Sequence, residues 1–224
     1  MHAFRLLPLF AVAAAAEWTE EAVGHDPSHD RYGLAGVNPL NLELIKVTSE
    51  AEEPASVAAI QKLLGDGASP SSHGDYNYSA LMWSIVKRRP EHVQLLLEAG
   101  ADTEFTNAWG RNAIFLAAWE GQAEVMALLV KHGADVDAAA KHDGYSALHK
   151  ASELGHVEVV RTLLDAGAEV NLPTLPERGE RSAKVGMTPL DLATQNGHEA
   201  VREMLIARHA VPASELPPEG KEEL

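Results

Sequence analysis

The sequence predicts an all-α solenoid, in which helix-turn-helix units joined by β-hairpin-like connections stack one upon the next. Two recurring markers and the apolar segments between them carry this prediction. The first marker is a Gly-Ala pair that recurs in steps of 33, 33 and 34 residues, at Gly67, Gly100, Gly133 and Gly167. A fixed period of this length is typical of stacked small units and not of one globular domain.

The second marker begins the first helix of each unit. Its first residue is Gly in three units and Asn in one, and these two types best tolerate a left-handed backbone. Two positions later stands a side chain that can accept the unpaired amide hydrogens of a helix start. These N-cap residues are Ser79, Asn112, Ser146 and Thr188. We therefore expect first helices at about 80–88, 113–120, 147–154 and 189–196.

The second helix of each unit follows directly and has apolar residues at helical spacing, so one of its faces should be buried. We expect Leu128 and Leu163 in this core. Such a helix pair cannot bury its apolar face alone, so it needs neighbours on both sides and altered units at the two ends. The runs that predict these helices begin at His92, Val125, Val157 and Val201.

In this register the units resemble the ankyrin repeat. The closest copies are Gly144-Tyr-Ser-Ala-Leu-His-Lys-Ala and the run that starts at Leu154-Gly-His, and several positions agree over four units. The resemblance covers about 70–210 and implies an ankyrin solenoid over 38–210, with a degenerate first unit as a cap. Its units are about 38–69, 70–102, 103–135, 136–169 and 170–210.

One position departs from the family. The histidine that the family carries early in the first helix is present only as His149. Met82, Phe115 and Asp191 replace it, which leaves its local hydrogen bonds open in the other units.

The resemblance implies that a monomeric chain binds another protein through a concave face, lined by hairpin arms and the exposed ends of first helices. Aromatic residues and Arg most often carry binding energy at such surfaces. Packing between neighbouring units is the alternative for Trp109 and Trp119, and we expect Trp83 in the core. The predicted partner-binding residues are Tyr76, Tyr78, Trp109, Arg111, Trp119, Glu120, Tyr145 and Leu154.

Composition excludes several function classes. The chain has 18 Lys and Arg against 33 Asp and Glu, which disfavours nonspecific attraction to nucleic acid or to anionic membranes. It has no cysteine, so disulfides, thiolate metal sites and cysteine nucleophiles are absent. No Ser/His/Asp set, carboxylate pair or phosphate-binding glycine loop stands in a supporting context. We therefore predict neither an enzyme nor a cofactor.

Both ends of the chain resemble targeting signals. Arg5 precedes an apolar stretch from Leu6 to Ala16, as in a secretory signal peptide over 1–16; a buried or amphipathic helix is the alternative. The last four residues, Lys221, Glu222, Glu223 and Leu224, resemble an endoplasmic reticulum retrieval signal; an ordinary acidic tail is the alternative. Together they predict residence in the endoplasmic reticulum lumen, with flexible segments at 17–37 and 211–224. A secreted or cytoplasmic adaptor is the rival reading.

Three further features call for an interpretation. Asn77 opens an Asn-Tyr-Ser sequon at a predicted hairpin tip, where a glycan competes with a purely structural role. The cluster His25–Asp30 holds four possible metal ligands. It is the basis of the rival hypothesis, a metal-dependent protein or enzyme. We expect a flexible linker and no metal there, because no scaffold fixes the ligands. The stretch 172–185 lengthens the last hairpin and is either a partner contact or a neutral insertion.

Overall fold

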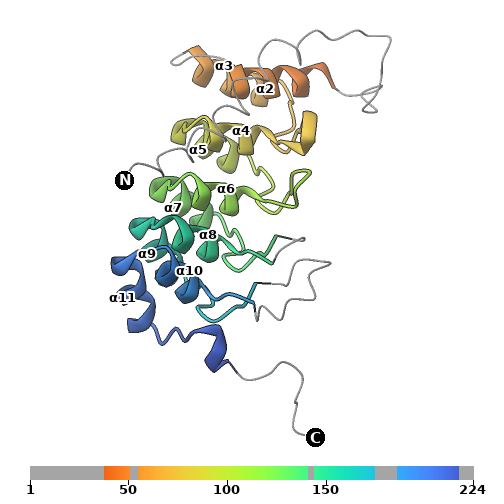
Figure 1. Cartoon of the computed structure of the whole chain (residues 1–224). Helices are drawn as coiled ribbons and strands as arrows, with labels where there is room; N and C mark the ends of the chain where they lie inside the picture. The colour runs from red at the N-terminus through yellow and green to blue at the C-terminus, as the bar shows by residue number, and fades with distance from the viewer. Residues whose placement is uncertain (1–37, 51–54, 141–143, 175–185, 217–224) are drawn as a thin grey trace, which may run out of the picture. The chain divides into compact units, whose positions relative to one another are not determined.

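The computed structural model describes residues 38–50, 55–140, 144–174 and 186–216 (Figure 1). The predicted signal peptide, the segment 17–37 with the cluster His25–Asp30, most of the insertion and the last four residues lie outside this part of the chain.

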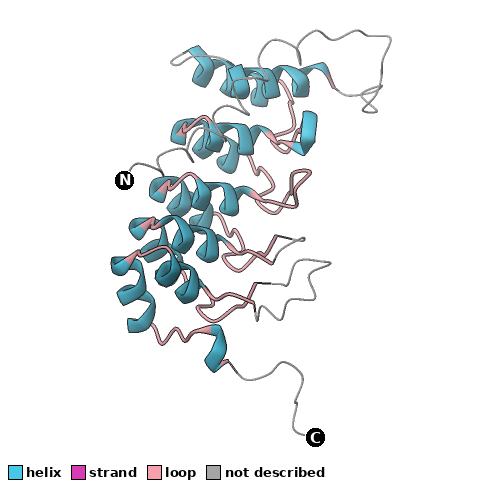
Figure 2. Ribbon diagram, viewed as in Figure 1, coloured by secondary structure: helices cyan, strands magenta, loops and turns pink. Residues whose placement is uncertain are grey.

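Pairs of helices stacked in chain order make up the described part, and Figure 2 shows the loops between successive pairs projecting to one side. Each first helix packs against its own partner and against the first helices of the adjacent units. No strand longer than an isolated bridge is present in these ranges, and the predicted all-α helix-turn-helix class is confirmed. The pairs are α2 (Pro39–Glu50) with α3 (Ala55–Gly65), α4 (Ala80–Val86) with α5 (Pro90–Glu98), α6 (Ala113–Trp119) with α7 (Ala123–Lys131), α8 (Ala147–Leu154) with α9 (Val157–Asp165), and α10 (Pro189–Gln195) with α11 (Glu199–Ala207). Two short 3-10 turns, η1 (Asp75–Asn77) and η2 (Ala213–Glu215), accompany them.

The predicted N-caps are all in use. Each of the four side chains accepts a hydrogen bond from the backbone N–H three residues further on, and each helix begins at the next residue. The N–H···O distances are 3.2 Å for Ser79 and Asn112, 3.4 Å for Ser146 and 3.3 Å for Thr188.

Units that lack a glycine at a turn still adopt its backbone. Arg88 (φ 58°) stands where Gly121 ends the next first helix, and His209 (φ 63°) stands where the other units have the glycine of the Gly-Ala pair. Asn77 (φ 57°) does the same at the hairpin. The repeat geometry therefore imposes the left-handed conformation even where the residue type disfavours it.

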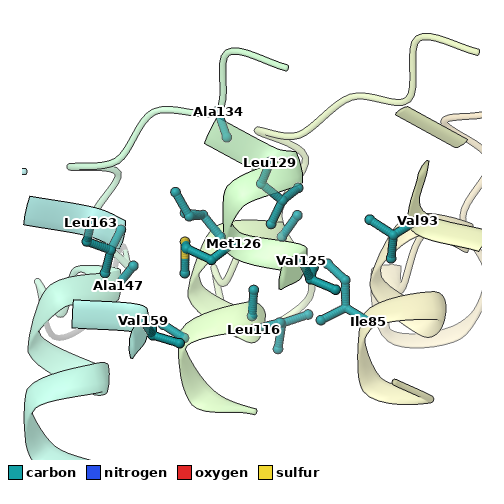
Figure 3. Close-up of a cluster of buried hydrophobic side chains, with 14 of the residues drawn as sticks. Ile85, Val93, Leu116, Val125, Met126, Leu129, Ala134, Ala147, Val159 and Leu163 are labelled. Carbon is teal, nitrogen blue, oxygen red and sulfur yellow. The ribbon is translucent and has the colours of Figure 1, made fainter. Parts of the chain in front are cut away.

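The core runs through all the units without interruption. Figure 3 shows one section of it, in which Met126 of α7 points toward Leu163 of α9. Leu129 and Leu163 are fully buried, as expected for Leu163, but Leu128 is only partly buried. Leu128 packs against the core without being enclosed by it, because the three successive apolar residues Leu128–Val130 cannot all lie on the inner face of one helix.

Adjacent units also interlock through a glycine and a histidine. The imidazoles of His156 and His198 lie against Gly121 and Gly155, and each Nε2–H donates to a backbone carbonyl of the preceding unit, Trp119 O at 3.2 Å and Glu153 O at 2.9 Å. Burial lowers the pKa of His156, the Trp119 carbonyl opposes this shift, and the neutral imidazole is favoured.

Truncation of the core should show the difference between the two leucines. We expect Leu163→Ala to lower the free energy of unfolding by about 2–5 kcal/mol, since a fully buried side chain leaves a cavity. Leu128→Ala should cost clearly less, because water already reaches that side chain. Urea denaturation followed by circular dichroism measures both, and equal losses would contradict the burial assigned to Leu128.

A pair of glycines tests the interlock. Gly155 and Gly197 have nearly the same backbone, with φ +75° and +73°, but only at Gly155 does an added Cβ meet a ring, the His198 imidazole at 2.5 Å. Gly197→Ala should cost about 1–2 kcal/mol for the left-handed backbone alone. Gly155→Ala should cost about 1–3 kcal/mol more, because the overpacked ring is held by its hydrogen bond. The same denaturation experiment applies, and indistinguishable losses would show that the ring moves aside freely.

Candidate functional site

Two hairpins present a stacked pair of exposed rings. Tyr76 and Trp109 lie 5.7 Å apart at an interplanar angle of 12°, and they remain 43% and 48% exposed. The hairpins that carry them are joined by a backbone hydrogen bond of 2.9 Å from Ala108 N–H to Tyr76 O. Neighbouring units thus combine to hold two aromatic faces at the surface, which a single hairpin could not do.

Tyr78 packs against Trp109, one member of this pair. Its ring meets Trp109 edge-on at 6.2 Å and Trp83 at 5.0 Å. Burial raises the pKa of Tyr78 against the opposing effect of a hydrogen bond with Asn107, so the hydroxyl stays protonated. The Asn107 carboxamide oxygen also accepts the backbone N–H groups of Trp109 and Arg111, both at 3.0 Å.

Trp83 lies at the edge of the core and not inside it. It was expected in the core, but it is only partly buried and packs on Tyr78 with the Lys87 ammonium 5.9 Å from its ring. The sequence placed it on the wrong side because α4 is only two turns long, and a small rotation of so short a helix moves a ring from the core to its edge.

The Trp119 ring is covered by two cationic side chains and is not fully exposed to solvent. The Arg111 guanidinium is 4.5 Å from its ring centroid and the Lys150 ammonium 4.7 Å, which are cation–π distances. Lys150 also lies 5.2 Å from the Tyr145 ring and forms an ion pair with Glu153. Trp119 is partly buried, and these contacts link it to the following unit.

Sequence reasoning missed Lys150. It sits beside the family histidine and three residues before Glu153, a spacing that brings two side chains together on a helix. That spacing could have predicted the ion pair. The ring contacts could not be predicted, because Trp119 belongs to another unit.

The last two predicted residues extend the face along the first helices. Glu120 accepts from Arg88 Nη1 at 3.3 Å, and the same Nη1 donates to the Glu120 carbonyl at 2.9 Å. Leu154, at the end of α8, is 40% exposed. We call the set the recognition face. Its members are Tyr76, Tyr78, Trp83, Trp109, Arg111, Trp119, Glu120, Tyr145, Lys150 and Leu154.

The two ends of the long last hairpin are tied together. Thr174 N–H donates to Met187 O at 3.0 Å, and Met187 N–H donates to Thr174 Oγ1 at 2.9 Å. A Cβ on Gly186 would stand 1.9 Å from Thr174 O, so only glycine fits at this closure. The insertion therefore leaves and re-enters the repeat at one fixed point, while residues 175–185 lie outside the described part.

Within the described ranges no group of three or more His, Asp or Glu side chains is placed to hold a metal ion. None of the helices in those ranges has the length and apolar character to cross a bilayer. Exposed rings beside cations are instead suited to binding another macromolecule.

Comparison with known proteins agrees with the repeat pattern. Residues 81–174 and 141–214 match the family described as ankyrin repeats (3 copies). Ankyrin repeat domain-containing protein SAT10 of Stachybotrys chartarum is 34% identical over 131 residues, which are 58% of this chain and 7% of that protein. NF-kappa-B inhibitor alpha of Mus musculus is 27% identical over 172 residues, which are 75% of this chain and 50% of that protein.

A bacterial protein is similar to this chain to a comparable degree. A putative ankyrin repeat-containing protein of Treponema pallidum is 36% identical over 120 residues, which are 54% of this chain and 37% of that protein. The chain thus spans half or less of each of these three relatives.

Proposed function

Because the chain belongs to the ankyrin repeat family, whose repeats are protein-interaction modules, we propose that it is a non-catalytic adaptor or scaffold that binds a protein partner on the recognition face. The observation that carries this proposal is the exposed stack of Tyr76 on Trp109. Large apolar rings are seldom left at the surface in pairs, and Trp and Tyr are the types enriched where binding energy concentrates.

Preorganisation strengthens the argument. Tyr76 and Trp109 are already stacked before a partner arrives, and the hydrogen bond from Ala108 N–H to Tyr76 O fixes the hairpins under them. A partner therefore does not have to order these side chains, and less binding energy is lost to conformational entropy. Trp119 contributes differently, because its ring is already partly covered by Arg111 and Lys150.

The partner can be sought without knowing its class. Proximity labelling from the full chain, with a labelling enzyme placed internally and the last four residues left unmodified, would supply candidates. Each candidate is then purified and its affinity for the chain measured by calorimetry.

Trp109→Ala should weaken binding to the confirmed partner by about 2 kcal/mol or more, a factor of about 30, as loss of a central aromatic anchor does. Its free energy of unfolding should change little, because the ring is half exposed. Ile206→Ala is the matched control, since Ile206 is equally exposed at 48% but lies on α11, outside the recognition face. Unchanged affinity in Trp109→Ala would place the partner-binding surface elsewhere.

Trp119→Ala should lower both the affinity for the partner and the free energy of unfolding, since its ring joins two units.

The proposed setting is the endoplasmic reticulum lumen. Support comes from the sequence: an apolar stretch from Leu6 to Ala16 behind Arg5, together with the terminal residues Lys221–Leu224. The retrieval-like tail has a use only in the presence of the signal peptide, since retrieval acts on proteins that have entered the secretory pathway.

Deletion of Lys221–Leu224 should move the protein from the cells to the medium, because the retrieval receptor reads a free C-terminus. The control is a chain in which these four residues are scrambled, so that length and charge are kept; it should be secreted as well. Immunoblots of medium and cells measure the distribution. Equal retention of all three forms would overturn the lumenal assignment.

A further inference from the structure

We propose that Asn77 is an N-glycosylation site set inside the recognition face, and that a glycan attached there covers the Tyr76–Trp109 ring pair and closes the face to partners. The inference rests on the proposed lumenal location. It goes beyond the proposed function because it makes partner binding depend on a modification.

The sequon is single and its acceptor is accessible. Asn77-Tyr78-Ser79 is the only Asn-x-Ser/Thr sequence in the 224 residues with a residue other than Pro at the middle position. Asn77 is exposed at the tip of η1, where its backbone N–H donates to Gly74 O at 3.2 Å.

The site lies between the two tyrosines of the recognition face. Both neighbours of Asn77 in the chain contact Trp109, Tyr76 by stacking at 5.7 Å and Tyr78 edge-on at 6.2 Å. The backbone hydrogen bond from Ala108 N–H to Tyr76 O holds the Trp109 hairpin beside the turn. A glycan is a bulky, strongly hydrated group. Attached at this turn, it begins next to the exposed rings.

The covalent step is a group transfer from a lipid-pyrophosphate-linked oligosaccharide. A bond forms between Asn77 Nδ2 and the anomeric carbon of the sugar, and the bond from that carbon to the pyrophosphate oxygen breaks. The lipid pyrophosphate leaves with the electron pair, and Nδ2 loses one proton.

The fold also sets when this step takes place. The third sequon residue, Ser79, is 2% exposed, and its hydroxyl accepts the Met82 N–H as the N-cap of α4. A transferase that reads the sequon through this hydroxyl must act before α4 forms. Glycosylated and unmodified molecules are therefore separate populations that do not interconvert after folding.

The repeat itself supplies two controls. Ser79→Asn removes the sequon but keeps an N-cap, because Asn112 caps the next unit in the same way. Asn77→Gly also removes it and produces the motif Gly-Tyr-Ser-Ala-Leu, which the chain already has at Gly144. Both variants should therefore fold like the unmodified protein, which circular dichroism and thermal melting would verify.

The experiment uses the full chain made in cells with a secretory pathway. Mass spectrometry of the peptide that contains Asn77 measures occupancy. Hydroxyl radicals then serve as the probe, and the oxidation rates of Trp109 and Tyr76 are compared between the glycosylated protein and the two variants, with Ile206 as an exposed reference outside the face. We expect oxidation of both rings to be several-fold slower in the glycosylated protein, with Ile206 unchanged.

Three outcomes would overturn the proposal. Equal oxidation of Trp109 in all forms would show that the glycan leaves the rings open. An unmodified Asn77 in chains that are protected from protease inside microsomes would show that the sequon is not used. Chains that never enter microsomes would remove the lumenal premise. None of these readouts involves a partner, so failure here is distinct from failure of Trp109→Ala to weaken binding.

Discussion

The stack depends on one contact that recurs in every unit and joins the unit's first residues to the turn that follows its second helix. A side chain near the start of each unit, which lies in α2 for Asn41 and in the turn for the other four, accepts the backbone N–H of the residue that follows the Gly-Ala position or its substitute. This ladder satisfies an amide that would otherwise lie unpaired at the turn, and it fixes the register of one hairpin against the next. The acceptor–donor pairs are Asn41 with Ser69 at 2.7 Å, Ser71 with Asp102 at 3.0 Å, Glu104 with Asp135 at 3.0 Å, Asp137 with Glu169 at 2.8 Å, and Asn171 with Val211 at 2.9 Å.

The recognition face inherits its geometry from this register. Tyr76 and Trp109 belong to different units and stack only if their hairpins are held at a constant offset, which the Ser71–Asp102 contact and the hydrogen bond from Ala108 N–H to Tyr76 O provide. The same offset places Lys150 of one unit over Trp119 of the one before it. The solenoid thus makes composite surfaces out of units that individually carry one or two rings.

The sequence was sufficient for the elements because their signals are local. N-caps, turn residues and apolar spacing act within a few positions, so the helix starts followed from Ser79 and its equivalents. The hairpin positions of the recognition face followed from the repeat register. What the sequence could not supply were contacts between units. Whether Trp83 faces the core or Tyr78, and whether Trp119 lies open or beneath Lys150, depends on rotations and neighbours that no local pattern encodes.

The substituted family histidine shows how a departure from a repeat can itself be structural. In the penultimate described unit, His149 Nδ1 accepts the Ser146 N–H at 3.1 Å, and its Nε2–H reaches forward to Met187 O at 3.1 Å in the next unit. Asp191 replaces this histidine in the unit that follows. Its Oδ2 likewise accepts the N–H of its own N-cap, Thr188, at 3.0 Å. The same oxygen also accepts the Ala213 N–H at 2.9 Å. A histidine there would have to offer its second nitrogen as a donor, whereas the returning chain presents a backbone N–H, which needs an acceptor. The exchange of His for Asp therefore matches the point where the stack of helix pairs gives way to η2, and it is best understood as part of the C-terminal cap.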